Sequence, residues 1–328
     1  MMTLNLLFCI IGFLLLYYGA GWLVKGSSSL ARSLGLTPVV IGLTVVAFGT
    51  STSEFVVSIV ASIKGNSMIA VGNAIGSNIC NIALILGMAA LFRPITSSRS
   101  VIKRDIPIML GISIYLLLIS IDSRLGRLEG ATLFGGIILY TFFNYHMAIK
   151  DSRQVQENFA GRLESGMEES GYITSRSRQI TLILSGIVGV VAGAQIVVDS
   201  AVKIMEILSV SEKFIGLTII AFGTSLPELA TSVVAAIKKE MDISIGNLVG
   251  SNVFNILGVL GVASLIRPIP VPGGFIASGM IIDYIVMIFT SFLPWIFMRK
   301  SLSVNRGDGL LLITCYFGYL TYLVIQSL

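Results

Sequence analysis

Long apolar runs alternate with short polar loops along the whole chain. Each run is predicted to be a helix that crosses a membrane, because 18 or more residues at 1.5 Å per residue span a hydrocarbon core of about 30 Å. The ten predicted helices cover residues 4–24, 36–63, 68–92, 104–121, 129–148, 179–199, 212–237, 242–265, 273–298 and 309–327. The chain lacks the alternation, in segments of about ten residues, that is typical of a membrane β-barrel. The pattern therefore predicts an all-α membrane protein.

One long polar stretch, residues 149–178, divides these helices into two sets of five. It carries ten charged side chains, and we interpret it as a mobile, solvated linker. The predicted organisation is a first five-helix half at 1–148, the linker, and a second five-helix half at 179–328.

The basic residues of the loops are unevenly divided between the two sides of the predicted membrane. With ten helices, 16 of the 22 Lys and Arg residues lie on the side opposite to the N-terminus. Short cytoplasmic loops retain Lys and Arg. We therefore expect a multi-pass protein of the cell membrane with a cytoplasmic linker and both termini extracytoplasmic. The run at 4–24 has no basic segment before it and is expected to be the first membrane helix rather than a cleaved signal.

The composition argues against several other classes of protein. Only 12% of the residues are charged, against about 25% in soluble domains. Three distant cysteines offer no disulfide framework, and the single histidine, His146, leaves no histidine pair for a transition metal and argues against a serine–histidine catalytic site. The basic residues are scattered, which argues against nucleic-acid binding. We expect a protein that is not an enzyme, needs no cofactor and has the lipid bilayer, but no obligate protein, as its partner.

The two halves share one long segment. Residues 41–95 align with 215–269 without a gap, and 30 of the 55 positions are identical, including polar and glycine positions. This indicates a duplication. Because each unit has an odd number of helices, the second copy must enter the membrane from the opposite side. We expect two inverted five-helix repeats with broken helices that meet at the membrane midplane.

The first repeated motif is GTSTSE at 49–54, copied as GTSLPE at 223–228. Glycine, hydroxyl residues and Pro227 weaken a helix, and the freed backbone groups then need a wet, protein-lined cavity. Carbonyls, hydroxyls and the carboxylates of Glu54 and Glu228 are hard oxygen donors, which suit Na⁺, Ca²⁺ or Mg²⁺. A capping box, in which each glutamate only caps its own helix, is the alternative. A carboxylate in mid-membrane costs about 2.5–3.5 kcal/mol, and its presence at two equivalent positions favours a cation site.

The second repeated motif is GNAIGSNICN at 72–81, copied as GNLVGSNVFN at 246–255. Its glycines, four residues apart, allow helices to approach closely. The serine and the last asparagine of each copy are also four apart, so they present a hydroxyl and an amide on one helix face. The remaining asparagines are interpreted as residues that cap the broken helices rather than bind ions: Asn73, Asn78, Asn247 and Asn252.

With these paired motifs on inverted halves, the chain resembles the cation/calcium antiporter superfamily, and in particular its prokaryotic sodium/calcium exchanger branch. The resemblance implies a diamond of four cation sites formed by side chains of both motifs and by two backbone carbonyls. The ligands that it implies are Thr50, Ser51, Glu54, Ser77, Asn81, Thr224, Ser225, Glu228, Ser251 and Asn255, with the carbonyls of Ala47 and Ala221.

The chain departs from the family pattern at two places. Thr52 and Ser53 stand where the family usually has Leu-Pro, so we expect a gentler break in the first copy. Some relatives have an aspartate where this chain has Asn255. With two carboxylates rather than three, the site is not expected to co-transport potassium.

The implied function is secondary antiport of Ca²⁺ against Na⁺ by alternating access, with helices 4–24 and 179–199 sliding against the motif bundle. The implied side chains offer twelve oxygens and two negative charges, enough for one Ca²⁺ or for several Na⁺ but not for both. A proton-driven Ca²⁺ exchanger is an alternative, because buried paired carboxylates readily take protons, although the GNxxE pattern of proton/calcium relatives is absent. A cation channel is a further alternative. Asp283, which the repeat does not copy, is interpreted as a hydrogen-bond acceptor that faces the bundle.

Overall fold

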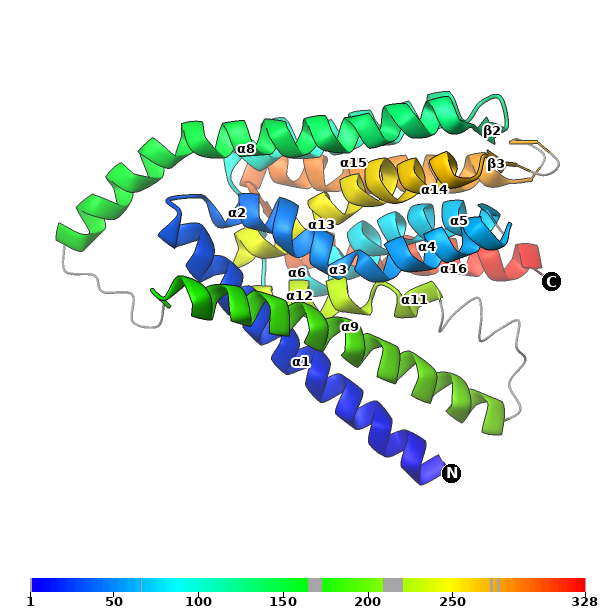
Figure 1. Ribbon diagram of the computed structural model, residues 1–328, viewed down its shortest axis with the longest axis horizontal. Coiled ribbons are helices and arrows are strands. Elements are labelled where there is room, and N and C mark those ends of the chain that lie inside the picture. The colour runs from blue at the N-terminus through cyan, green and yellow to red at the C-terminus, as the bar shows by residue number, and fades with distance from the viewer. Residues whose placement is uncertain are drawn as a thin grey trace.

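The computed structural model describes residues 2–65, 67–164, 173–208, 221–271, 274–275 and 278–327, and nearly all of them are helical (Figure 1). The elements of the first half are α1 (Met2–Ser33), α2 (Pro38–Ile41), η1 (Gly42–Val46), α3 (Ala47–Thr50), α4 (Thr52–Lys64), α5 (Ser67–Ile79), η2 (Cys80–Leu86), α6 (Gly87–Phe92), β1 (Ile95–Thr96), η3 (Val101–Asp105), α7 (Ile106–Ile119), β2 (Arg124–Leu125) and α8 (Arg127–Glu164). Those of the second half are α9 (Arg176–Ile207), α11 (Ala221–Gly223), α12 (Leu226–Ile237), α13 (Met241–Phe254), η5 (Asn255–Leu260), α14 (Gly261–Ile266), β3 (Ile269–Pro270), α15 (Met280–Ser301), β4 (Ser303–Val304) and α16 (Arg306–Ser327). The η segments are π-helical.

Several of these helices are long and apolar enough to cross a membrane. Among the described residues six pass that test: Met2–Ser33, Met68–Phe92, Arg176–Met205, Met241–Ile266, Met280–Ser301 and Arg306–Gln326. A bent pair, Pro38–Thr50 with Thr52–Lys64, adds a seventh span. The start of the predicted helix 212–237 lies outside the described residues, because the structure describes this stretch only from residue 221. The chain is thus a multi-pass helical membrane protein, and ten helices stay a prediction.

Two predicted helix boundaries differ clearly from the structure. The first helix runs on to Ser33 rather than ending at residue 24, because 25–33 contains no proline and its small residues pack inside the protein. The ninth predicted helix begins at Met280 rather than 273, since Gly274 and Gly279 take positive φ angles that end a helix.

The predicted linker is helical at both ends rather than a loop throughout. Helix α8 continues to Glu164, because between Gly136 and Gly161 the chain has neither glycine nor proline to stop it. Helix α9 already begins at Arg176, and residues 165–172 of the linker lie outside the described part of the chain.

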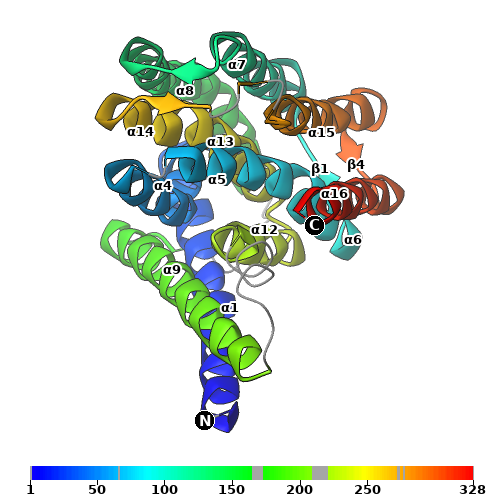
Figure 2. The same ribbon diagram turned by 90° about the vertical axis from the view of Figure 1, so that its right-hand side faces the viewer.

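Helices α1 and α9 form an antiparallel pair that is set apart from the other helices (Figures 1 and 2). Gly12 meets Gly193, whereas Gly26 meets Gln179, so the two chains run in opposite directions. A Cβ atom on Gly19 would lie 2.8 Å from the backbone nitrogen of Val190, which shows how closely the backbones approach.

The rest of the molecule is a bundle in which the two halves interlock. Helix α13 packs on α2, η1, α3 and α12, and α5 packs on α4, α15 and η5. Two short antiparallel ladders join the halves, pairing Ile95 with Val304 and Leu125 with Ile269. Ile95 and Ile269 are equivalent positions of the repeat, so the second ladder copies the first.

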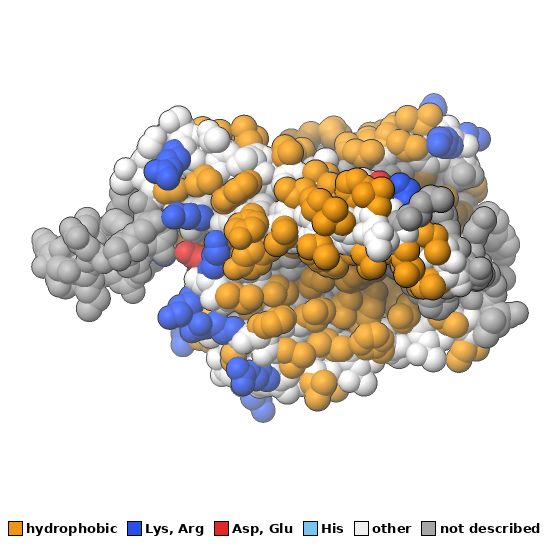
Figure 3. Space-filling view, turned by 90° about the horizontal axis from the view of Figure 1, so that it is seen from below, with side chains coloured by type: hydrophobic (Ala, Val, Ile, Leu, Met, Phe, Trp, Pro, Cys, Tyr) orange, Lys and Arg blue, Asp and Glu red, His pale blue; other side chains and the backbone are white. Residues whose placement is uncertain are grey.

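The two ends of the bundle differ in charge. Both chain termini lie towards the right-hand end in Figure 1, whereas α8 ends on the left. The face shown in Figure 3 is broadly hydrophobic, and Lys and Arg side chains gather mainly at its left-hand end.

Candidate cation site

Both copies of the first motif interrupt a helix at the same serine. Ser51 separates α3 from α4, and the two helices are bent by 46°. Ser225 precedes α12, whose first turn contains Pro227. The predicted breaks at the two motifs are therefore present.

The serine of each motif binds the glutamate of the other motif. The hydroxyl of Ser51 donates to Oε1 of Glu228 at 3.0 Å, and the hydroxyl of Ser225 donates to Oε1 of Glu54 at 3.4 Å. All four side chains are fully buried. Neither serine makes a side-chain cap bond to its own helix, so the capping-box interpretation is wrong for the serines. The crossed bonds therefore join the two motifs in one buried cluster that contains both carboxylates.

Further hydroxyls line this cluster. Ser77 accepts a hydrogen bond from Ser225 at 3.3 Å, and the hydroxyl of Ser53 lies 2.9 Å from Oε2 of Glu54 and 3.0 Å from the carbonyl oxygen of Thr224. Sequence reasoning did not identify Ser53 as a site residue, because its equivalent in the second copy is Pro227 and the repeat carries no signal there.

The equivalent threonines Thr50 and Thr224 are each held by an asparagine of the other half. Thr50 donates to Oδ1 of Asn247 at 3.1 Å, and the amide of Asn247 donates to Ser232 at 3.2 Å. The mirrored set is Thr224, Asn73 and Ser58. Ser58 and Ser232 were also missed, although their identity in the two copies was a usable signal.

Four asparagines form a second cross-connection between the halves. The amide groups of Asn78 and Asn252 each donate to the backbone carbonyl of the other residue, at 3.1 and 3.3 Å. These bonds fix which way both amides point, so their Oδ1 atoms must accept from Asn255 and Asn81, at 3.1 and 3.0 Å. Asn78 and Asn252 therefore orient their neighbours across the interface, which is a different role from the predicted helix capping.

Asn81 and Asn255 consequently present their oxygens away from this network. Both residues lie in π-helical segments, Cys80–Leu86 and Asn255–Leu260, a departure from regular helix that is frequent at functional sites. The second motif thus widens its helix instead of breaking it.

Four buried oxygens of the predicted site have no hydrogen-bond partner. They are Asn81 Oδ1, Ser251 Oγ, Glu228 Oε2 and Asn255 Oδ1. Leaving a buried acceptor unsatisfied costs about 1–3 kcal/mol. A cation bound among these oxygens would satisfy them, and oxygen donors suit Na⁺, Ca²⁺ or Mg²⁺ rather than a softer metal.

The structure brings most of the predicted ligands into this buried cluster. The carbonyl of Ala47 accepts from the backbone N–H of Ser51 at 3.0 Å and lies 3.4 Å from the hydroxyl of Thr50. Ala221 begins α11. A role of these two carbonyls as ligands stays a prediction. Asp283 accepts a hydrogen bond from the hydroxyl of Tyr319 at 2.9 Å, as expected for an acceptor that faces the bundle.

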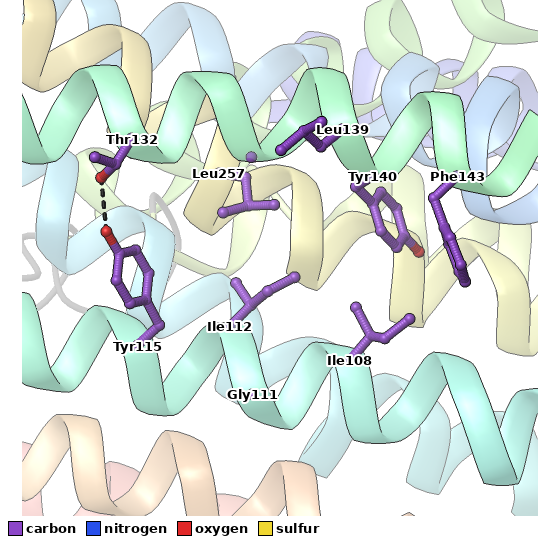
Figure 4. A pocket seen from close by; sticks show the side chains of 10 residues that line it. Ile108, Gly111, Ile112, Tyr115, Thr132, Leu139, Tyr140, Phe143 and Leu257 are labelled. Atoms are coloured by element: carbon purple, nitrogen blue, oxygen red, sulfur yellow. Dashed lines mark hydrogen bonds between the residues drawn. The ribbon is translucent and has the colours of Figure 1, made fainter.

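Of two cavities in the protein, one reaches this cluster and the other does not. One of about 670 Å³ lies between α4 and α9 and reaches Ser53 and Thr224 at the edge of the site; Asp199 also lines it. The other, of about 430 Å³ between α7 and α8, is lined mainly by apolar side chains and contains none of the predicted ligands (Figure 4). The first cavity is the one that connects with the cluster.

Comparison with known proteins identifies relatives over nearly the whole length. The family model described as sodium/calcium exchanger protein matches residues 4–146 and 178–325. The putative antiporter CaxA of Alkalimonas amylolytica is 37% identical over 332 residues, with 99% of this chain and 100% of the relative covered. The sodium/calcium exchanger MaX1 of Methanosarcina acetivorans is 31% identical, with 98% and 99% covered.

A solved structure also matches. That of the sodium-calcium exchanger NCX_Mj soaked with zero Na⁺ and Ca²⁺ superposes with a TM-score of 0.82 at 33% identity, covering 98% of this chain and 100% of the other. The likeness therefore extends to sequence and fold alike.

Proposed function

The chain belongs to the sodium/calcium exchanger protein family, and from this premise we propose that it is a secondary antiporter that exchanges Ca²⁺ for Na⁺ across the cell membrane. Membership of this family makes it an ion transporter and not an enzyme, with Ca²⁺ and Na⁺ as its substrates. The observation that carries the exchange mechanism is the crossed pair of serine–glutamate hydrogen bonds, with unpartnered oxygens beside it.

The proposed ligands are the residues of the two motifs. Glu54 and Glu228 supply two negative charges, which balance one Ca²⁺ or two Na⁺, and calcium needs six to eight oxygens. The hydroxyls and amides of the cluster supply the remainder. Because one buried cluster serves both ions, one load excludes the other, which is the requirement for antiport.

Alternating access is proposed to come from the α1–α9 pair. This pair contacts the bundle mainly along α12 and α2. Its two helices are packed tightly on each other, because side chains such as Val197 and Ile183 lie directly against glycines of α1, so the pair is proposed to slide as a unit. The antiparallel direction of these two equivalent helices, and the crossed contacts between equivalent residues, support two inverted repeats. The cavity between α4 and α9 is the proposed route to the site.

We expect both termini to be extracytoplasmic and residues 149–178 to be cytoplasmic, because 16 of 22 basic residues lie on the linker side. The test introduces a single cysteine at Ser152 or at Ser327 into a chain in which Cys9, Cys80 and Cys315 are replaced by alanine. In intact cells, a membrane-impermeant thiol reagent should label position 327 and spare position 152. Labelling of both positions alike would contradict this orientation.

The proposed antiport makes calcium flux depend on a cation on the opposite side of the membrane. Proteoliposomes loaded with Na⁺ should accumulate Ca²⁺, whereas vesicles loaded with an impermeant organic cation should not. A channel with the same oxygens would pass Ca²⁺ down its gradient in both. Equal uptake in the two preparations, with the membrane potential clamped, would therefore reject antiport against sodium.

A further inference from the structure

A third cavity, separate from the two described above, lies where α7 begins and α15 ends. It has a volume of about 650 Å³ and contains none of the proposed cation ligands. Its lining residues are Arg99, Ile102, Lys103, Pro107, Trp295, Arg299, Lys300 and Leu302. We call it the basic pocket.

Four cationic side chains surround this pocket without acidic partners. Arg99, Lys103, Arg299 and Lys300 are exposed, and none of them forms an ion pair within the described part of the chain. The carboxylate nearest in sequence, that of Asp105, is fully buried and bound to Arg104 at 2.8 Å. The guanidinium of Arg299 lies over the ring of Trp295, 5.1 Å from its centre. The pocket is therefore strongly positive and suits an anion.

Next to the pocket, α7 and α15 carry exposed apolar side chains. Along α7, Ile114 and Leu118 continue the face of Pro107 and are 46% and 58% exposed. Along α15, Phe292 and Ile285 continue the face of Trp295 and are 40% and 53% exposed. The two helices pack side by side (Figure 2), so these residues form one apolar strip that leads from the pocket towards the other side of the membrane.

We propose that the basic pocket binds the phosphodiester headgroup of an anionic phospholipid, whose acyl chains lie along the strip formed by α7 and α15. The cations bind the phosphate, and Trp295 lies at the level of the headgroups, where tryptophan is enriched. A free phosphate would use the cations but not the apolar strip. The basic residues lie at helix ends on the side of the protein that we expect to face the cytoplasm, where the leaflet facing them is anionic.

Trp295 offers a direct readout, because the chain has only two tryptophans. In a Trp22→Phe background, Trp295 is the sole reporter. Phosphatidylglycerol with brominated acyl chains should quench its fluorescence more strongly than phosphatidylcholine with the same brominated chains at equal mole fraction. The ratio of the two association constants measures the headgroup preference and cancels changes in emission between variants.

Two pocket variants and one matched control test the assignment. Arg99→Gln/Arg299→Gln should lower the ratio about tenfold or more, since each basic residue near the surface contributes about 1 kcal/mol. Lys103→Gln/Lys300→Gln should do the same while leaving the Arg299–Trp295 contact in place. The control, Arg176→Gln/Arg178→Gln, removes two exposed arginines at the start of α9, in the linker that we also expect to be cytoplasmic, and should keep the ratio.

Three outcomes would overturn the proposal. The first is equal quenching by the two lipids in the parent protein. The second is an equal fall of the ratio in the control, which would reveal general surface charge instead of a site. The third is recovery of fluorescence on adding excess inorganic phosphate, which would mean that the pocket holds a free anion. None of these results bears on cation exchange at the buried cluster.

Discussion

Glu54→Gln and Glu228→Gln are each expected to abolish calcium exchange while the protein stays folded. Each substitution removes half of the negative charge of the cluster, but the amide keeps the shape and can still accept from Ser225 or Ser51. The fall in initial rate of ⁴⁵Ca²⁺ uptake should exceed the roughly 10- to 100-fold loss that follows removal of a residue that only supports a metal ligand. Gel filtration and the thermal unfolding midpoint check that the variants remain folded.

Asp283→Asn is the matched control for these substitutions. Asp283 also lies in an apolar helix and accepts a hydrogen bond from Tyr319, but it is not part of the motif cluster. The same change from acid to amide should therefore leave exchange near the rate of the parent protein. Uptake at the parent rate in either glutamate variant would show that the carboxylates are not cation ligands.

The crossed contacts predict that one glutamate cannot replace the other. Glu54 belongs to the first half but is held by Ser225, and Glu228 belongs to the second half but is held by Ser51. Asn78 and Asn252 are also connected across the halves, because each amide donates to the backbone carbonyl of the other residue. Both glutamates and both motif serines, which are proposed ligands, thus bind side chains of the opposite repeat, and a shift of one repeat relative to the other would change these contacts together.

The sequence could predict the centre of the molecule because the duplication marks it. Identical glycine, hydroxyl and carboxylate positions at a fixed offset identified the helix breaks at Ser51 and Ser225 and the residues around them. The paired contacts between halves follow from the same symmetry. The cost of burying a carboxylate favoured a binding site over a capping motif, and the structure shows that the motif serines do not cap their own helices.

The remaining features could not be predicted from a single chain. The length of α8 depends on the absence of helix-breaking residues in a polar stretch, which hydropathy alone treats as a loop. Ser53 has no hydroxyl residue at the equivalent position of the second copy, so its contacts with Glu54 and Thr224 are visible only in the folded structure. The roles of Asn78 and Asn252 required the relative position of the two halves, because each donates to the backbone of the other.

An outward Na⁺ gradient is expected to drive Ca²⁺ into proteoliposomes when the pH is equal on both sides. A proton mechanism would need only the two carboxylates, which would release protons for calcium and take them up for the return step. The cluster contains many more oxygen donors than a proton mechanism needs. They include the hydroxyls of Thr50, Ser51, Ser77 and Ser225. Hydroxyl and amide oxygens can hold monovalent ions in separate places, which two carboxylates alone cannot.

The decisive comparison uses vesicles loaded with sodium and vesicles loaded with choline, at one clamped pH. Uptake of Ca²⁺ should occur only in the sodium-loaded vesicles. If three Na⁺ leave for each Ca²⁺, the loaded site carries a net charge of +1 and a positive charge leaves with the sodium, so an inside-positive potential should accelerate uptake. Equal uptake in the two preparations would reject coupling to sodium. Uptake that instead followed an imposed pH gradient would identify a proton-driven exchanger, in which Glu54 and Glu228 carry the protons.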